Sequence, residues 1–145
     1  HGNGNHDKET HARAKAFLAF QFTQPGAPII SVGDVVKSDK SLVTFYQSLI
    51  ALRKSYPLLT DGKVSFYEMD DENNVLAYAR ENKDGERIYI AFNMSSKSLK
   101  MPTPLGFMSS TKVRVWQSNF PKLREFVTQG PITMRPLTAT IMIIP

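Results

Sequence analysis

The sequence predicts an α+β fold in which two helices and one or two short strands precede an antiparallel Greek-key β-sandwich. Apolar residues recur at helical spacing in the first part of the chain, whereas the second part alternates with period two and is rich in β-branched and aromatic residues. Of the 145 residues, 41% are hydrophobic and 21% charged, which is the composition of a folded globular protein. We place the boundary between Tyr56 and Asp61, so residues 1–57 form the helical part and residues 58–145 the β part.

The first predicted helix covers residues 7–22, and Asp7 or Thr10 can cap its N-terminus. Its second half is apolar on all sides, which is typical of a helix enclosed by neighbouring elements. The Gln-Pro-Gly-Ala-Pro sequence at residues 24–28 must end it. The short apolar run at residues 29–32 then predicts a strand that is buried on both faces.

The second predicted helix covers Ser41–Ser55, where apolar side chains follow the i, i+3, i+4, i+7 pattern until Pro57 ends it. After it the sequence changes to short alternating stretches separated by clusters of turn-forming residues. These stretches predict five strands, at Lys63–Met69, Val75–Arg80, Arg87–Phe92, Lys112–Trp116 and Thr138–Ile144.

Three consecutive polar residues, Asn5, His6 and Asp7, precede the first predicted helix directly. They bring together an amide, an imidazole and a carboxylate. Active sites at the carboxyl ends of barrel strands are assembled in this way, with the strand delivering the polar groups and a helix following them. Taken alone, however, Asp7 is better explained as a helix N-cap, because Asp is among the commonest residues at that position.

The order of these features resembles the C-terminal third of the α-amylase family, which includes α-glucosidases, amylases and cyclomaltodextrinases. The resemblance rests on Asn-His-Asp, the Pro-Gly-x-Pro-x-Ile stretch, the Leu-Ile-Ala-Leu-Arg-Lys helix at residues 49–54 and the β part that follows. It implies that residues 4–34 are the last two β/α steps of a (β/α)8 catalytic barrel. Ser41–Ser55 would then be the last barrel helix, and residues 61–145 the β-sandwich called domain C.

The resemblance also implies roles for the three polar residues. Asp7 would be the catalytic carboxylate that stabilises the transition state, and His6 and Asn5 would bind the sugar. A glycosidase develops positive charge at the anomeric carbon, which a fixed carboxylate stabilises. The family takes its nucleophile and general acid from the middle of the barrel, so this chain would be a retaining α-glycoside hydrolase only with that barrel, and inactive alone.

The sequence departs from the family pattern at two places. Gly33-Asp34 is followed by Val35 rather than Glu, and no arginine follows Asn-His-Asp directly. We therefore keep a second interpretation open, in which the chain is a non-catalytic relative or an accessory β-sandwich module used for structural or protein contacts.

Other sites are not indicated. Gly-Asn-His-Asp also resembles one block of the metallophosphoesterases, but no histidine follows His11 to complete a two-metal centre. The acidic run at residues 70–72 lacks the spacing of a calcium loop and predicts a solvated turn. We predict no metal and no cofactor. We also predict that the strand aromatics fill a core rather than bind sugar: Tyr67, Tyr78, Tyr89, Phe92 and Trp116.

The expected partners follow from charge and apolar surface. The net charge is +5, but the basic residues are scattered, so nucleic acid is not expected; no apolar run approaches the ~20 residues that cross a bilayer. An α-glucan or oligosaccharide is expected if the barrel is complete. Self-association or docking to a missing barrel half through residues 1–55 is also expected. In a complete barrel the other β/α units would cover six apolar residues that need another partner here: Phe17, Leu18, Phe20, Ile29, Ile30 and Val32.

Overall fold

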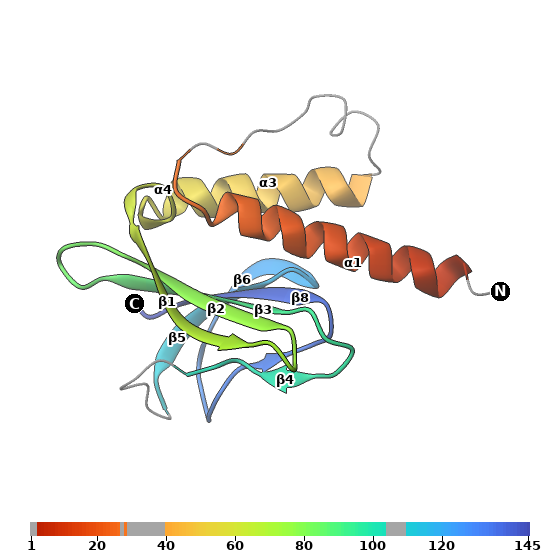
Figure 1. Cartoon of the computed structure of the whole chain (residues 1–145). Helices are drawn as coiled ribbons and strands as arrows, with labels where there is room; N and C mark the ends of the chain where they lie inside the picture. The colour runs from red at the N-terminus through yellow and green to blue at the C-terminus, as the bar shows by residue number, and fades with distance from the viewer. Residues whose placement is uncertain (1–2, 27, 29–39, 104–109) are drawn as a thin grey trace.

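The computed structural model describes residues 3–26, 28, 40–103 and 110–145. These residues form three layers (Figure 1). Two long helices lie side by side on one face of a six-stranded sheet, and a two-stranded sheet lies on its other face. All strand pairs are antiparallel, so the predicted α+β fold is confirmed.

The helical layer consists of α1 (Asn3–Phe22) and α3 (Lys40–Ser55), and the short α4 (Leu58–Asp61) leads into the sheet. The predicted start of the first helix at Asp7 is wrong, because α1 begins four residues earlier and takes Asn5, His6 and Asp7 into its first two turns. A strand end at this position would need a parallel neighbour to pair with. Among the described residues there is none, so the local backbone hydrogen bonds of a helix satisfy these groups instead.

The six-stranded sheet has the order β1-β2-β3-β8-β5-β6, and β4 pairs with β7 in the small sheet. The first three strands form a meander. The last strand, β8, returns to lie beside β5, as in a Greek key. The strand bounds are β1 Lys63–Asp70, β2 Val75–Glu81, β3 Arg87–Asn93, β4 Leu99–Lys100, β5 Lys112–Gln117, β6 Phe120–Val127, β7 Thr133–Met134 and β8 Thr138–Ile143.

All five predicted strands are present with ends within one residue of the prediction, as β1, β2, β3, β5 and β8. Three strands were not predicted. β4 and β7 have two residues each and show no periodicity. β6 contains Pro121 and three charged residues and is exposed along almost its whole length. It lies at the edge of the sheet, where strands tolerate proline and carry charge.

The four central strands of the six-stranded sheet, β2, β3, β8 and β5, are buried on both faces, and their period-two alternation divides the core in two. On the helical side, β-strand residues such as Tyr78, Ile90 and Trp116 pack with Phe45 and Leu49 of α3. The opposite face packs against the small sheet through a second set of buried residues: Val75, Ala77, Ala79, Tyr89, Ala91, Met101, Val113, Val115, Met134 and Met142. Helices and sheet therefore share one of the two cores. The boundary between Tyr56 and Asp61 coincides with the connection through α4 but remains a prediction as a domain limit.

The apolar side chains predicted to need cover in the helical part differ in their burial. Leu18 and Phe20 pack against the helical side of the sheet, whereas Phe17 is 60% exposed. The predicted strand at residues 29–32 and the Gly33-Asp34 pair lie outside the described residues. No helix in the described part combines the length and the apolar character needed to span a membrane.

Candidate functional site

The three residues identified from the sequence lie at the N-terminal end of α1. Asn5 and His6 belong to its first turns, and the Asp7 side chain is exposed to solvent. The structure therefore places these residues next to one another on a helix. An active-site strand end would instead direct them into a common pocket.

The strongest polar cluster of the described chain lies at the other end of α1. Arg80 of β2 is fully buried, and its guanidinium donates to backbone carbonyls rather than to a carboxylate. Its Nη1 donates to Thr23 O at 2.7 Å and also to Leu59 O, and its Nε donates to Gly62 O at 3.1 Å. These carbonyls belong to the ends of α1 and α4, where helical backbones leave acceptors without partners. One side chain therefore joins both helix ends to the sheet.

A second arginine extends this cluster. Arg53 of α3 donates through Nη1 to Phe22 O at 2.6 Å and to Gln24 O at 3.1 Å, and through Nη2 to Gly26 O. Burial lowers the pKa of Arg53, and burial together with the neighbouring Arg53 charge lowers the pKa of Arg80. Two cations can lie this close because carbonyl dipoles at helix C-termini offset their charge.

Tyr78 completes the junction from the sheet. Its hydroxyl is hydrogen-bonded to Thr23 Oγ1 and accepts from Gln24 Nε2 at 2.9 Å. Burial raises the pKa of Tyr78 to about 12. We call this cluster of Arg53, Arg80, Tyr78 and Thr23 the arginine junction. It fixes the C-terminal end of α1 on the sheet, so its role is structural.

The sequence contains a signal for the arginine junction, namely a charged residue at position 80 of a predicted strand. The strand prediction alone did not identify this residue as part of a site. In β2, Arg80 occupies the same face as Leu76 and Tyr78, and this face packs against the helices. A charged residue at an inward position of a strand must find buried partners. That position therefore marks a polar contact across the core, although only the tertiary structure identifies the acceptors.

A cavity of about 770 Å³ lies where α4 approaches the ends of β3, β5 and β8. Its lining includes Tyr56, Ile88, Tyr89 and Arg114. Arg114 Nη1 donates to Tyr56 Oη at 3.3 Å, and its Nε pairs with Glu125 at 2.7 Å, so its guanidinium is already engaged. The cavity can hold a small polar molecule, but these contacts give no catalytic arrangement.

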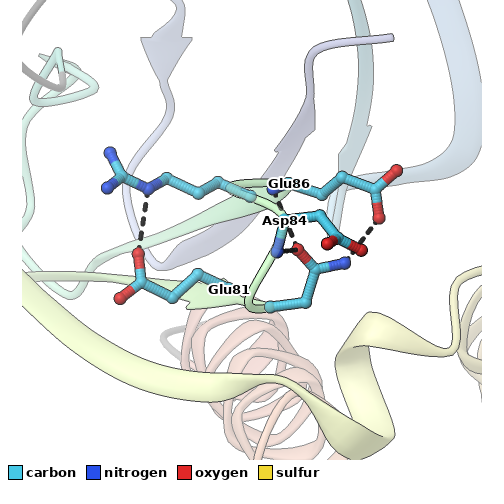
Figure 2. Close-up of polar contacts among 5 residues, drawn as sticks. Glu81, Asp84 and Glu86 are labelled. Carbon is cyan, nitrogen blue, oxygen red and sulfur yellow. Dashed lines mark hydrogen bonds and ion pairs between the residues drawn. The ribbon is translucent and has the colours of Figure 1, made fainter.

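The acidic residues of the β2–β3 hairpin do not form a metal site (Figure 2). Asn82 Oδ1 accepts from the backbone N–H groups of Asp84 and Glu86, both at 3.0 Å, and Asn82 Nδ2 donates to Glu86 Oε2 at 2.6 Å. Glu81 pairs with Arg87 at 2.9 Å. These contacts are those of a hairpin turn. Within the described residues no group of three or more His, Cys, Asp or Glu side chains could hold a metal ion.

The remaining sequence predictions concern turns and aromatics. Asp70 accepts from the backbone and side chain of Asn73, at 3.2 and 2.7 Å, as a solvated turn requires. Tyr78, Phe92 and Trp116 are at most 5% exposed, so the prediction that these aromatics fill the core is confirmed.

Comparison with known proteins places the β part in a defined family. Residues 67–127 match the model of the alpha amylase C-terminal all-beta domain. Residues 67–127 are therefore similar to that domain. The chain is 32% identical over 112 residues to a cyclomaltodextrinase of Geobacillus thermopakistaniensis, a match that covers 64% of this chain and 19% of that protein. It is 35% identical over 75 residues to an oligo-1,6-glucosidase of Heyndrickxia coagulans, covering 52% and 13%.

The fold of the chain also matches solved structures. An Anoxybacillus α-amylase aligns with a TM-score of 0.73 at 19% identity, covering 92% of this chain and 32% of that one. A Geobacillus thermoleovorans α-amylase complexed with acarbose aligns with a TM-score of 0.66 at 20% identity, covering 90% and 32%. At this identity the likeness shows the fold alone. The chain thus resembles the C-terminal domain of α-amylase-family glycosidases and spans a fifth or less of the curated relatives named above.

Proposed function

We propose that this chain acts as the C-terminal part of a glycoside hydrolase that cleaves α-glucosidic linkages. The supporting observation is the match of residues 67–127 to the family's C-terminal all-β domain, in a chain that spans 19% of a cyclomaltodextrinase. In this proposal the nucleophile and the general acid belong to a catalytic barrel outside these 145 residues. The 145 residues alone are inactive, because a retaining glycosidase needs two carboxyl groups that flank the scissile bond.

Asp7 contributes the third carboxylate of such a site, and His6 and Asn5 donate to sugar hydroxyls. In α1 the Asp7 side chain is exposed. To reach a substrate, the first turns of α1 must therefore unwind and present these residues at a strand end. The first turn of a helix is the part that opens at least cost, since its hydrogen bonds are the most exposed. Pairing with a barrel strand would replace them.

The pure 145-residue chain should not hydrolyse maltotriose or a nitrophenyl α-glucoside above background. The reason is the missing nucleophile and general acid, since a single carboxylate cannot form and break the glycosyl intermediate. Release of glucose or nitrophenol by the pure chain measures this, with Asp7→Asn as the matched control. Turnover that disappears in Asp7→Asn would show that the chain carries a complete site and that the proposal is wrong.

We further propose that the catalytic barrel, or in its absence a second copy of the chain, contacts an apolar surface at the β1 edge. Phe17 of α1 and Phe66 and Met69 of β1 are 60%, 67% and 63% exposed. Phe17 lies one helical turn before Phe20, and both Phe20 and Phe66 contact the Tyr78 ring, at 6.3 and 5.9 Å between centroids. Met69 pairs with Leu76 of β2, on the same face of that strand as Tyr78. We call Phe17, Phe66 and Met69 the β1 patch.

Burying the β1 patch should drive self-association of the pure chain. Each large apolar side chain gains about 1.5–3 kcal/mol on complete burial, so Phe17→Ser together with Phe66→Ser should weaken association by at least about tenfold. Sedimentation over a range of concentrations measures the association constant. The matched control is Leu123→Ser with Val127→Ser on the opposite edge strand, β6, where both side chains are also exposed. A chain that stays monomeric, or equal weakening by both pairs, would contradict the assignment to this patch.

A further inference from the structure

A basic groove runs between the first half of α1 and two turns of the β part. Lys8, His11 and Lys15 are spaced i, i+3, i+7 along α1 and form one wall. Arg135, in the connection from β7 to β8, belongs to the opposite wall. The groove has a volume of about 490 Å³, within the range of small-molecule sites, and Ser118, Asn119 and Thr138 also line it.

The charge of this groove is not compensated within its lining. None of its lining residues is acidic. Among the ion pairs between described residues, none involves Lys8, Lys15 or Arg135. Lys15 Nζ lies 5.6 Å from the centroid of the Phe45 ring, a contact that leaves its positive charge in place. Three permanent cations around one concave site therefore favour an anion.

The floor of the groove is held rigidly by polar contacts. Ser118 is 2% exposed, and its Oγ accepts the Ala139 N–H at 2.8 Å. No hydrogen bond donated by this hydroxyl is found among the described residues, and Ser118 lines the groove. Thr138 Oγ1 donates to Arg135 O at 2.7 Å, and this bond fixes the connection that carries Arg135.

The backbone of the same connection is strained. Leu137 has a φ of 55°, in the left-handed region that a branched side chain rarely adopts. The conformation is maintained because the Leu137 side chain is buried, at 8% exposure. Such strain persists only where the surrounding structure enforces it. Here it keeps Arg135 opposite α1.

We propose that this groove binds a small molecule that carries a phosphate group. Phosphate offers several acceptor oxygens around one centre, which matches donors converging from two walls and a floor: the Lys8 and Lys15 ammonium groups, the Arg135 guanidinium and the Ser118 hydroxyl. The groove lining does not include Asp7, and its walls are those of the chain alone, in which α1 is helical from Asn3.

Titration of the ¹⁵N-labelled chain with inorganic phosphate, at an ionic strength held constant with sodium chloride, tests the site. The expected result is saturable shifts of the Ser118, Asn119 and Thr138 amide signals. Arg135→Gln and Lys8→Gln should each raise the Kd for phosphate about tenfold, which corresponds to one lost charge-assisted hydrogen bond. The matched control is Lys83→Gln in the β2–β3 hairpin, at the opposite end of the sheet from the start of α1 (Figure 1), which should leave the Kd unchanged.

Three outcomes would overturn the proposal. They are the absence of saturable binding, an equal loss of affinity in Lys83→Gln, and shifts spread over all basic surfaces. Acetate at the same ionic strength gives a further comparison, since equal affinity for acetate would remove the assignment to phosphate. Thermal unfolding of each variant shows whether it remains folded, and the positions of the shifted amides in the unsubstituted chain test the site without any substitution.

Discussion

Replacing Arg80 by methionine should lower the free energy of unfolding by about 2–4 kcal/mol. Arg80 is fully buried and donates to Thr23 O and Gly62 O. Methionine can fill the space but cannot donate, so both carbonyls would lose a buried donor at about 1–3 kcal/mol each. Relief of the desolvated charge offsets only part of this loss. The midpoint of urea denaturation measures the change.

Two further variants distinguish the loss of the hydrogen bonds of the arginine junction from the loss of a positive charge in general. Arg87→Met on the neighbouring strand removes a surface ion pair with Glu81 and should change the free energy of unfolding far less than Arg80→Met does. Arg80→Lys retains the charge but not the planar arrangement of donors, so its loss should lie between the other two. If Arg80→Met and Arg87→Met had equal effects, the junction would not stabilise the fold.

Removing residues 1–57 should leave a β-rich chain that self-associates strongly. The face that packs on the small sheet keeps its own core, including Val113 and Met134. The helical face loses its cover, because Tyr78, Ile90 and Trp116 are buried against α1 and α3. Side chains of this size lose about 1.5–3 kcal/mol each when exposed, which a second copy of the face can recover. Far-UV circular dichroism and sedimentation of residues 58–145 measure the two effects.

A chain of residues 40–145 is the matched comparison, since it keeps α3 and should associate more weakly than residues 58–145. The complete chain, in which both helices cover this face, gives the reference. A monomeric 58–145 with a cooperative thermal transition would show that the β part needs no helical cover. Loss of the β signal would show instead that the core shared between helices and sheet is required for folding.

The β part could largely be predicted from the sequence, since period-two alternation is written directly into the residues. β2, β3, β5 and β8 were found with ends within one residue, because both faces of these strands are buried and the pattern is strong. β6 was missed, since an edge strand needs hydrogen bonds from one neighbour only and carries no apolar pattern that burial would impose.

The candidate site was less accessible to sequence reasoning, and the family resemblance alone indicated it. Asn5, His6 and Asp7 give no local signal that distinguishes a strand end from the first turns of a helix, because that choice depends on whether a neighbouring strand is present. In the described structure they lie in α1. The basic groove was missed because its cations come from residues 8–15 and Arg135, which are far apart in the chain.

By itself the sequence determined the helical and alternating segments, the order of the motifs and the family that they resemble, because each depends on residues close together in the chain. The tertiary structure alone decided three further things: where the polar residues at the start of α1 lie, which carbonyls the buried Arg80 binds and which basic side chains converge. Each requires segments that are distant in sequence, such as Thr23 and Arg80, to meet across a shared core. Long-range packing sets those contacts, and no local periodicity encodes them.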